Sequence, residues 1–197
     1  MQILILGDSW AADWSSQYDQ YAGWPNILAD RYSVTNVAQA GVSQYSITQQ
    51  LEHLTPGDYD RVIVSITSPY RLYTPQHPVH TAGLHENSDL IYTDLEYHLS
   101  LQPDNKQIQS AIGFYKHHFD TEQAEYVHQL LVEDTLKDCD PLYTIVTSNI
   151  SDNERYVPAG FRYCEGHNIY QSYPGRINHM NEEGNHLFAH SISQLLE

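Results

Sequence analysis

A serine stands directly behind the first apolar run of the chain. Residues 3–6 are Ile-Leu-Ile-Leu, and Gly7, Asp8 and Ser9 follow without a spacer. An apolar run that stops at such residues predicts a buried strand ending in a tight turn, with the serine hydroxyl at the end of a sheet. A helix after the turn would bring backbone N–H groups, which favour negative charge, close to the serine. A nucleophile that attacks an ester carbonyl has these requirements.

A serine nucleophile needs a base, and His179 is our candidate among the twelve histidines of the chain. It stands in a polar segment just before the last predicted helix. From such a loop a side chain can reach back to the ends of the strands. The sequence therefore predicts a Ser9–His179 pair.

Two other histidine groups have spacings that could suggest metal binding. His186 and His190 are spaced i, i+4 on the last predicted helix, but no third ligand is apparent, and we interpret them as a solvated helix face. His77, His80 and His85 lie in a proline-rich stretch without a Cys or an acidic partner at ligand spacing. We therefore expect a site with no metal and no other cofactor.

Strands alternate with helices along the chain. The patterns predict strands at residues 3–6, 33–37, 61–67 and 142–147, and helices that open near residue 24 and cover 46–54, 106–119, 121–136 and 182–196. This alternation is typical of an α/β fold with a mainly parallel sheet. Ligands bind at the carboxyl ends of such strands, so one edge of the sheet should gather the residues that follow them: Ser9, Gly41, Thr67 to Pro69 and Asn149.

The remaining segments show no clear period. Residues 72–103 are rich in proline and polar side chains, and we interpret them as an insertion or lid. Residues 149–178 are expected to be irregular. No repeat or linker divides the chain, so residues 1–197 are expected to form a single domain, long enough to bury a sizeable core.

Composition limits the partners. The chain has 25 Asp and Glu against 9 Lys and Arg, a net charge of −16, which argues against nucleic acid and anionic membranes. No apolar run approaches a membrane span and the N-terminus lacks signal-peptide features, so a cytoplasmic protein is expected. Cys139 and Cys164 are expected to be free, buried thiols. The sixteen tyrosines would suit a sugar ligand if they gathered in a cleft.

These motifs together resemble the SGNH (GDSL) hydrolases. The resemblance rests on Gly7-Asp8-Ser9, on Gly41-Val42-Ser43 after the second strand, and on His179 before the last helix. It implies a three-layer α/β/α fold with about five parallel strands. It also implies that Ser9 is the nucleophile, that His179 is the general base, and that the backbone N–H groups of Ser9 and Gly41 form an oxyanion hole.

The chain departs from the family pattern at the third oxyanion donor. The family usually presents an asparagine in a turn after the third strand, where this chain has Ser65-Ile66-Thr67-Ser68-Pro69. The hydroxyl of Thr67 or of Ser68 could donate instead. A hydroxyl rotates and is a less fixed donor than an amide, so we expect a weaker oxyanion hole.

The second departure concerns the partner that orients His179. The family places an aspartate three residues before the histidine, and this chain has Arg176 there. A backbone carbonyl, Asn178 or an acid from elsewhere, such as Asp152, could take over this role, and a serine–histidine dyad is a further alternative.

Arg71 and Arg176 could bind a carboxylate of the substrate in bidentate fashion, although an ion pair with one of the chain's acids is the commoner use of arginine. Together with Asp8, these arginines form the candidate substrate-binding set.

The sequence thus predicts a serine-dependent hydrolase of a small acyl ester, with carbohydrate O-acetyl groups as the leading expectation. Two alternatives remain open. An acyltransferase would use the same residues with an acceptor other than water. A weakly active or inactive module that binds a glycan or a protein would explain the missing asparagine and aspartate.

Overall fold

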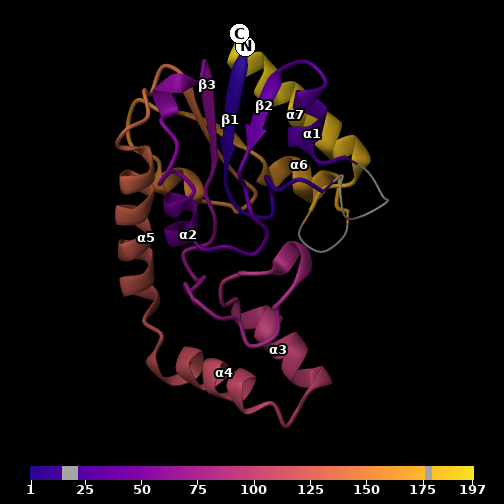
Figure 1. The fold of residues 1–197 in the computed structure, drawn as a ribbon, viewed down its shortest axis with the longest axis vertical. Helices are drawn as coiled ribbons and strands as arrows, with labels where there is room; N and C mark the ends of the chain where they lie inside the picture. The colour runs from indigo at the N-terminus through magenta and orange to yellow at the C-terminus, as the bar shows by residue number, and fades with distance from the viewer. Residues whose placement is uncertain (15–21, 176–178) are drawn as a thin grey trace.

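The computed structural model describes residues 1–14, 22–175 and 179–197 (Figure 1). Within them, one sheet has five parallel strands in the order β2-β1-β3-β4-β5. The strands are β1 (Gln2–Leu6), β2 (Ser33–Asn36), β3 (Arg61–Ser65), β4 (Thr144–Ser148) and β5 (Arg162–Glu165). The helices are α1 (Trp24–Ala29), α2 (Gln44–Gln49), α3 (Tyr92–Leu101), α4 (Lys106–His118), α5 (Thr121–Leu136), α6 (His167–Ser172) and α7 (Glu182–Leu196). Short 3₁₀ helices cover Pro56–Asp58, Gly83–His85 and Asn153–Tyr156.

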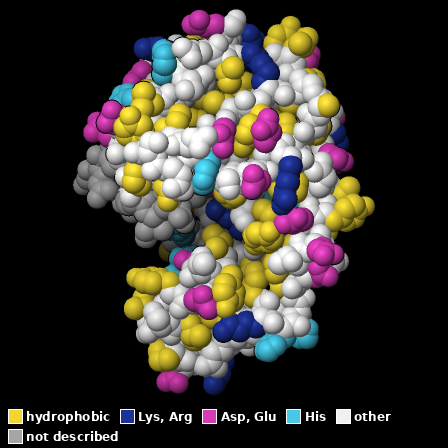
Figure 2. Space-filling view, turned by 180° about the vertical axis from the view of Figure 1, so that it is seen from behind, with side chains coloured by type: hydrophobic (Ala, Val, Ile, Leu, Met, Phe, Trp, Pro, Cys, Tyr) yellow, Lys and Arg dark blue, Asp and Glu magenta, His cyan; other side chains and the backbone are white. Residues whose placement is uncertain are grey.

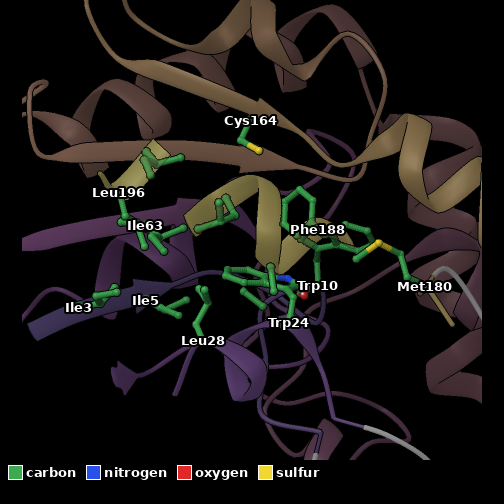
Figure 3. Packing of buried hydrophobic residues seen from close by; sticks show 14 residues of the cluster. Ile3, Ile5, Trp10, Trp24, Leu28, Ile63, Cys164, Met180, Phe188 and Leu196 are labelled. Carbon is green, nitrogen blue, oxygen red and sulfur yellow. Dashed lines mark hydrogen bonds between the residues drawn. The ribbon is translucent and has the colours of Figure 1, made fainter. Parts of the chain in front are cut away.

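Helices cover both faces of the sheet because its strands are apolar on both sides. In β1, Ile3 and Ile5 face α1 and α7, where they pack with Trp24 and Phe188 (Figure 3). The alternate residues of β1, Leu4 and Leu6, face α2 and α5 on the other side. This is the pattern of a parallel strand buried between two helical layers, and the predicted three-layer α/β/α fold is confirmed.

The break predicted near Asp120 is confirmed by its capping geometry. The carboxylate of Asp120 accepts a hydrogen bond of 3.0 Å from Gln123 N and so begins α5. The last helix begins in the same way, because the side chain of Asn181 accepts a bond of 2.9 Å from Gly184 N. Phe188 and Ile192 of α7 are buried and pack against the sheet.

The sequence analysis missed regular elements in two segments. Residues 72–103 contain α3, and α3 packs with α4 into a lobe below the carboxyl ends of the strands, opposite both termini (Figure 1). Residues 149–178 contain β5 and α6, so the sheet has one strand more than the four we placed. Only Leu95 is buried in α3 and only Cys164 in β5, which leaves no periodic apolar pattern to detect.

The structure also bears on the two cysteines and on membrane-spanning helices. Cys139 and Cys164 are both free and buried, as predicted. Burial raises the pKa of each thiol to about 11, which makes both unreactive. Across the described part of the chain, no helix combines the length and the apolar character needed to cross a bilayer.

Candidate active site

The parallel sheet brings the ends of its first four strands to one edge. Ser9 follows β1, Gly41 follows β2, Thr67 follows β3 and Asn149 follows β4, as the sequence predicted. Hydrogen bonds between the loops hold this edge together, and the most buried of them runs from the Thr67 hydroxyl to Asp8 over 2.8 Å. The candidate residues therefore come from different strands but occupy one side of the molecule.

The turn that carries Ser9 is tightly held. Gly7 has a φ of +152°, and a Cβ at this position would lie 2.6 Å from the Cβ of Ser65, so only glycine fits. The side-chain amide of Gln50 accepts from Gly7 N and donates to Gly7 O, both over 2.9 Å. Asp8 Oδ1 accepts from Trp10 N over 3.0 Å. Ser9 is left half-buried at the tip of this turn.

His179 lies against the backbone of Ser9. Its Nε2 is 3.0 Å from the Ser9 carbonyl oxygen, and because a carbonyl only accepts, Nε2 donates in this arrangement. Trp14 Nε1 donates to the same oxygen over 2.8 Å. The indole and imidazole rings also meet edge to face, with centroids 4.7 Å apart. The structure thus brings His179 to Ser9 across 170 residues of sequence.

Trp14 is a site residue that the sequence analysis missed. It lies five residues after Ser9 in a polar, aromatic stretch, and this proximity to the serine was the signal available. Its two contacts fix both the Ser9 carbonyl and the face of the His179 ring. Trp14 therefore has the position of a residue that orients the base.

Asp8 and Arg71 are paired with each other. Asp8 is 1 % exposed, and its Oδ2 lies 3.0 Å from Arg71 Nη1, which also donates to Val42 O over 2.9 Å. The ion pair therefore joins the loops that follow β1, β2 and β3. A buried carboxylate needs such a partner, so the two residues expected to bind substrate are bound to each other in this structure.

The two candidate hydroxyl donors differ in what they already bind. Thr67 is fully buried, and its single hydroxyl proton goes to Asp8. The Ser68 hydroxyl accepts a bond of 3.2 Å from Tyr70 N, which does not use the serine proton. The geometry therefore favours Ser68 over Thr67 as a donor to a substrate.

The loop of Gly41 is braced by the insertion. Gly41 has a φ of +78°, and a Cβ there would lie 2.6 Å from the Cβ of Ser88. Gly41 O accepts from Asp89 N over 3.0 Å. The Asp89 carboxylate in turn accepts from Ser43 N over 2.6 Å and from Thr74 N over 2.9 Å. Sequence analysis missed Asp89 because its contacts with the Gly41 loop, such as the one to Ser43, span 46 residues of sequence.

Two cavities open next to this edge, and both touch Ser68 and Arg71. The larger, of about 740 Å³, lies between the ends of β3 and β4 and the α3–α4 lobe, and four tyrosines line it: Tyr70, Tyr92, Tyr115 and Tyr170. The smaller, of about 400 Å³, lies between α2, α4 and α5. On the face shown in Figure 2, hydrophobic side chains gather where the lobe meets the body of the molecule.

The remaining candidates do not add to the site. Arg176 and Asn178 lie outside the described residues. Asp152 is exposed and has a left-handed backbone conformation, with a φ of 64°, just before the 3₁₀ helix Asn153–Tyr156. His186 and His190 are exposed on α7, as expected for a solvated helix face.

Comparisons with known proteins find similarity among solved structures. No protein-family model and no curated protein matches this sequence. Among solved structures, the chain is similar to "a putative lipolytic protein of G-D-S-L family from Desulfitobacterium hafniense DCB-2", with 11% sequence identity, a TM-score of 0.46 and 99% of each chain covered. The chain itself has the three-layer architecture with five parallel strands that its resemblance to the SGNH (GDSL) hydrolases implies.

Proposed function

We propose that this chain is a serine-dependent hydrolase that cleaves a small acyl ester. The observation that carries the proposal is the meeting of Ser9 and His179 at the end of β1. A serine at the tip of a strained turn, with an imidazole beside it, is the arrangement that covalent acyl transfer requires. The fold supports the same conclusion, because this edge of a parallel sheet is where ligands bind.

The reaction begins when Ser9 Oγ attacks the ester carbonyl and His179 takes the hydroxyl proton. Catalytic hydrogen bonds often tighten only when substrate is bound, so His179 has to move from the Ser9 carbonyl to the Ser9 hydroxyl. Trp14 keeps a donor on that carbonyl oxygen after the ring has moved. Trp14 therefore lowers the cost of bringing the base into position.

The tetrahedral intermediate places negative charge on the former carbonyl oxygen. The backbone N–H groups of Ser9 and Gly41 would donate to it, and the Ser68 hydroxyl is our candidate for the third donor. His179 then gives its proton to the departing alcohol, and an acyl-Ser9 ester remains. Water attacks this ester with His179 again as base, which releases the acid and restores the serine.

A carbohydrate O-acetyl ester is the substrate we favour. The tyrosine-lined cavity of about 740 Å³ begins at Ser68 and can hold a small sugar. Tyrosine offers an apolar ring and a polar tip, which suits the two kinds of surface on a sugar. The acetyl group would then lie at the end of β1 and the sugar below the end of β3.

Turnover measurements test this proposal. We expect hydrolysis of p-nitrophenyl acetate to exceed that of the octanoate, and acetylated oligosaccharides to release acetate. Ser9→Ala and His179→Gln should each lower kcat by roughly 10³-fold or more. Ser191→Ala, at a half-buried position of α7, and His186→Gln, at an exposed one, serve as matched controls and should leave kcat unchanged. Equal activity in all four variants would refute the proposal.

A further inference from the structure

A second cluster of reactive side chains lies in the insertion, and nothing in the proposed reaction uses it. His77 and His80 come from the loop after β3, while Asp94 and His98 lie on α3. The imidazole Nε2 of His80 is 2.9 Å from Asp94 Oδ2, and that of His77 is 3.9 Å from the same oxygen. His98 Nε2 is 3.6 Å from the other oxygen, Asp94 Oδ1. Three histidines thus surround one carboxylate.

These separations match a metal site. A tetrahedral ion with bonds of about 2.0–2.1 Å keeps its ligand atoms roughly 3.3 Å apart. The ligand atoms of His77, His80 and Asp94 all lie within 4.8 Å of one another. Two of the donors form the sequence pair His77-x₂-His80, a spacing that structural zinc sites also use.

His77 supplies an independent observation. Its side chain is completely buried, and in the described part of the chain its Nε2 has no hydrogen-bond partner, although it faces Asp94. A buried polar atom without a partner is costly, and a cation between this nitrogen and the carboxylate would remove the cost. The side chain of His80 is less buried than that of His77 and contacts the same carboxylate oxygen of Asp94.

The hydrogen bonds of His77 mean that its ring proton must change position before the residue can bind a metal ion. Its Nδ1 accepts from Val79 N over 3.1 Å and from His80 N over 3.0 Å, so a neutral ring carries its proton on Nε2. Binding through Nε2 requires that proton on Nδ1 and gives up these two bonds. We therefore expect His77 to contribute less to metal affinity than His80 and Asp94.

We propose that His77, His80 and Asp94 bind one divalent metal ion of the zinc type. Imidazole nitrogens with a carboxylate oxygen form a donor set that zinc accepts. The ion would tie the loop after β3 to α3. Between these ligands lie Ser88 and Asp89, which brace the loop of Gly41, so the metal would have a structural role. This proposal does not rest on the chemistry of Ser9.

The test uses the full chain, stripped with a chelator and titrated with Zn²⁺ alone by calorimetry. We expect one ion per chain and a rise in Tm. His80→Ala and Asp94→Asn should each weaken binding roughly tenfold or more. His186→Gln, which removes an exposed histidine outside the cluster, should bind as the wild type does.

A Co²⁺ spectrum of the wild-type protein keeps the proposal testable if the variants do not fold. An intense four-coordinate spectrum, lost on addition of one equivalent of Zn²⁺, supports the site. A faint six-coordinate spectrum, no binding to the folded stripped protein, or equal affinity in His80→Ala and His186→Gln overturns it.

Discussion

At the scale of residues, the Asp8–Arg71 ion pair joins the loops of the candidate site. The Asp8 carboxylate lies between the Thr67 hydroxyl and the Arg71 guanidinium, and Arg71 continues the contact to the loop after β2. Both charges are shielded from water, with side-chain exposures of 2% and 14%. Such a pair contributes little net stability by itself, but the loss of one partner leaves a buried charge uncompensated.

Arg71→Met is therefore expected to destabilise the protein by about 3–5 kcal/mol, because it leaves the Asp8 carboxylate buried without a cation. Urea denaturation measures this change in the free energy of unfolding. Lys137→Met is the matched control, since Lys137 pairs with Asp134 on the surface, where water screens the two charges and the pair contributes little to stability. An equal decrease in the free energy of unfolding in the two variants would show that the buried Asp8–Arg71 pair matters no more to stability than a surface pair.

At the scale of elements, the insertion supports the loop of Gly41. Ser88 packs against Gly41, and Asp89 binds the backbone of that loop and the hydroxyl of Ser46. The segment after β3 thus helps to fix the backbone that would donate to the substrate. A change at the contact between these two segments should affect the site without touching Ser9 or His179.

Gly41→Ala is expected to lower both stability and activity. The new Cβ would meet Ser88, and the positive φ costs a non-glycine residue about 1–2 kcal/mol. Thermal unfolding and the kcat for ester hydrolysis measure the two effects. Gly57→Ala is the control, because that position has an ordinary φ and nothing within 4 Å of an added Cβ. If Gly41→Ala behaved like Gly57→Ala, the loop would not need its observed conformation.

The sequence predicted those elements whose burial leaves a periodic pattern. The strands around Ile5 and Ile63, the capped helix at Asp120 and the amphipathic α7 were found for this reason. By contrast, α3 buries its residues only in the small cluster around Leu95, and β5 is the outermost strand of the sheet. Neither element therefore has a periodic apolar pattern in its sequence.

The site followed the same rule. Ser9 and Gly41 could be proposed because motif and strand end coincide in the sequence, and His179 because it stands just before the last helix. The Asp8–Arg71 pair, the bracing by Asp89 and the cluster around Asp94 depend on contacts between distant segments, and local sequence does not report these.

At the scale of the whole molecule, the sheet body carries the candidate nucleophile and the α3–α4 lobe lies below it (Figure 1). The helix α5 runs beside the sheet body (Figure 1) and buries His128 against Tyr156, with ring centroids 4.7 Å apart. Burial, and then the nearby Arg155, lower the pKa of His128 to about 4, while Glu125 acts in the opposite direction. His128 is therefore neutral in the folded protein at neutral pH.

This buried histidine predicts acid sensitivity. Its pKa is about 4 when folded and about 6.5 when unfolded, so the unfolded chain binds more protons below pH 6.5. Stability should be complete above pH 6.5 and fall as the pH drops towards 4, by roughly 3 kcal/mol from this residue. Urea denaturation at several pH values measures the slope. The slope should flatten in His128→Leu, and an unchanged slope would contradict this assignment.

The central claim is that His179 activates Ser9, and fluorophosphonate labelling of the intact protein tests it most directly. We predict one adduct per chain, located on the peptide that contains Ser9. It should be lost in His179→Gln and kept in His186→Gln, with far-UV circular dichroism to show that each variant is folded. The absence of an adduct on the folded wild-type protein, or labelling of Ser9 that does not depend on His179, would contradict the account.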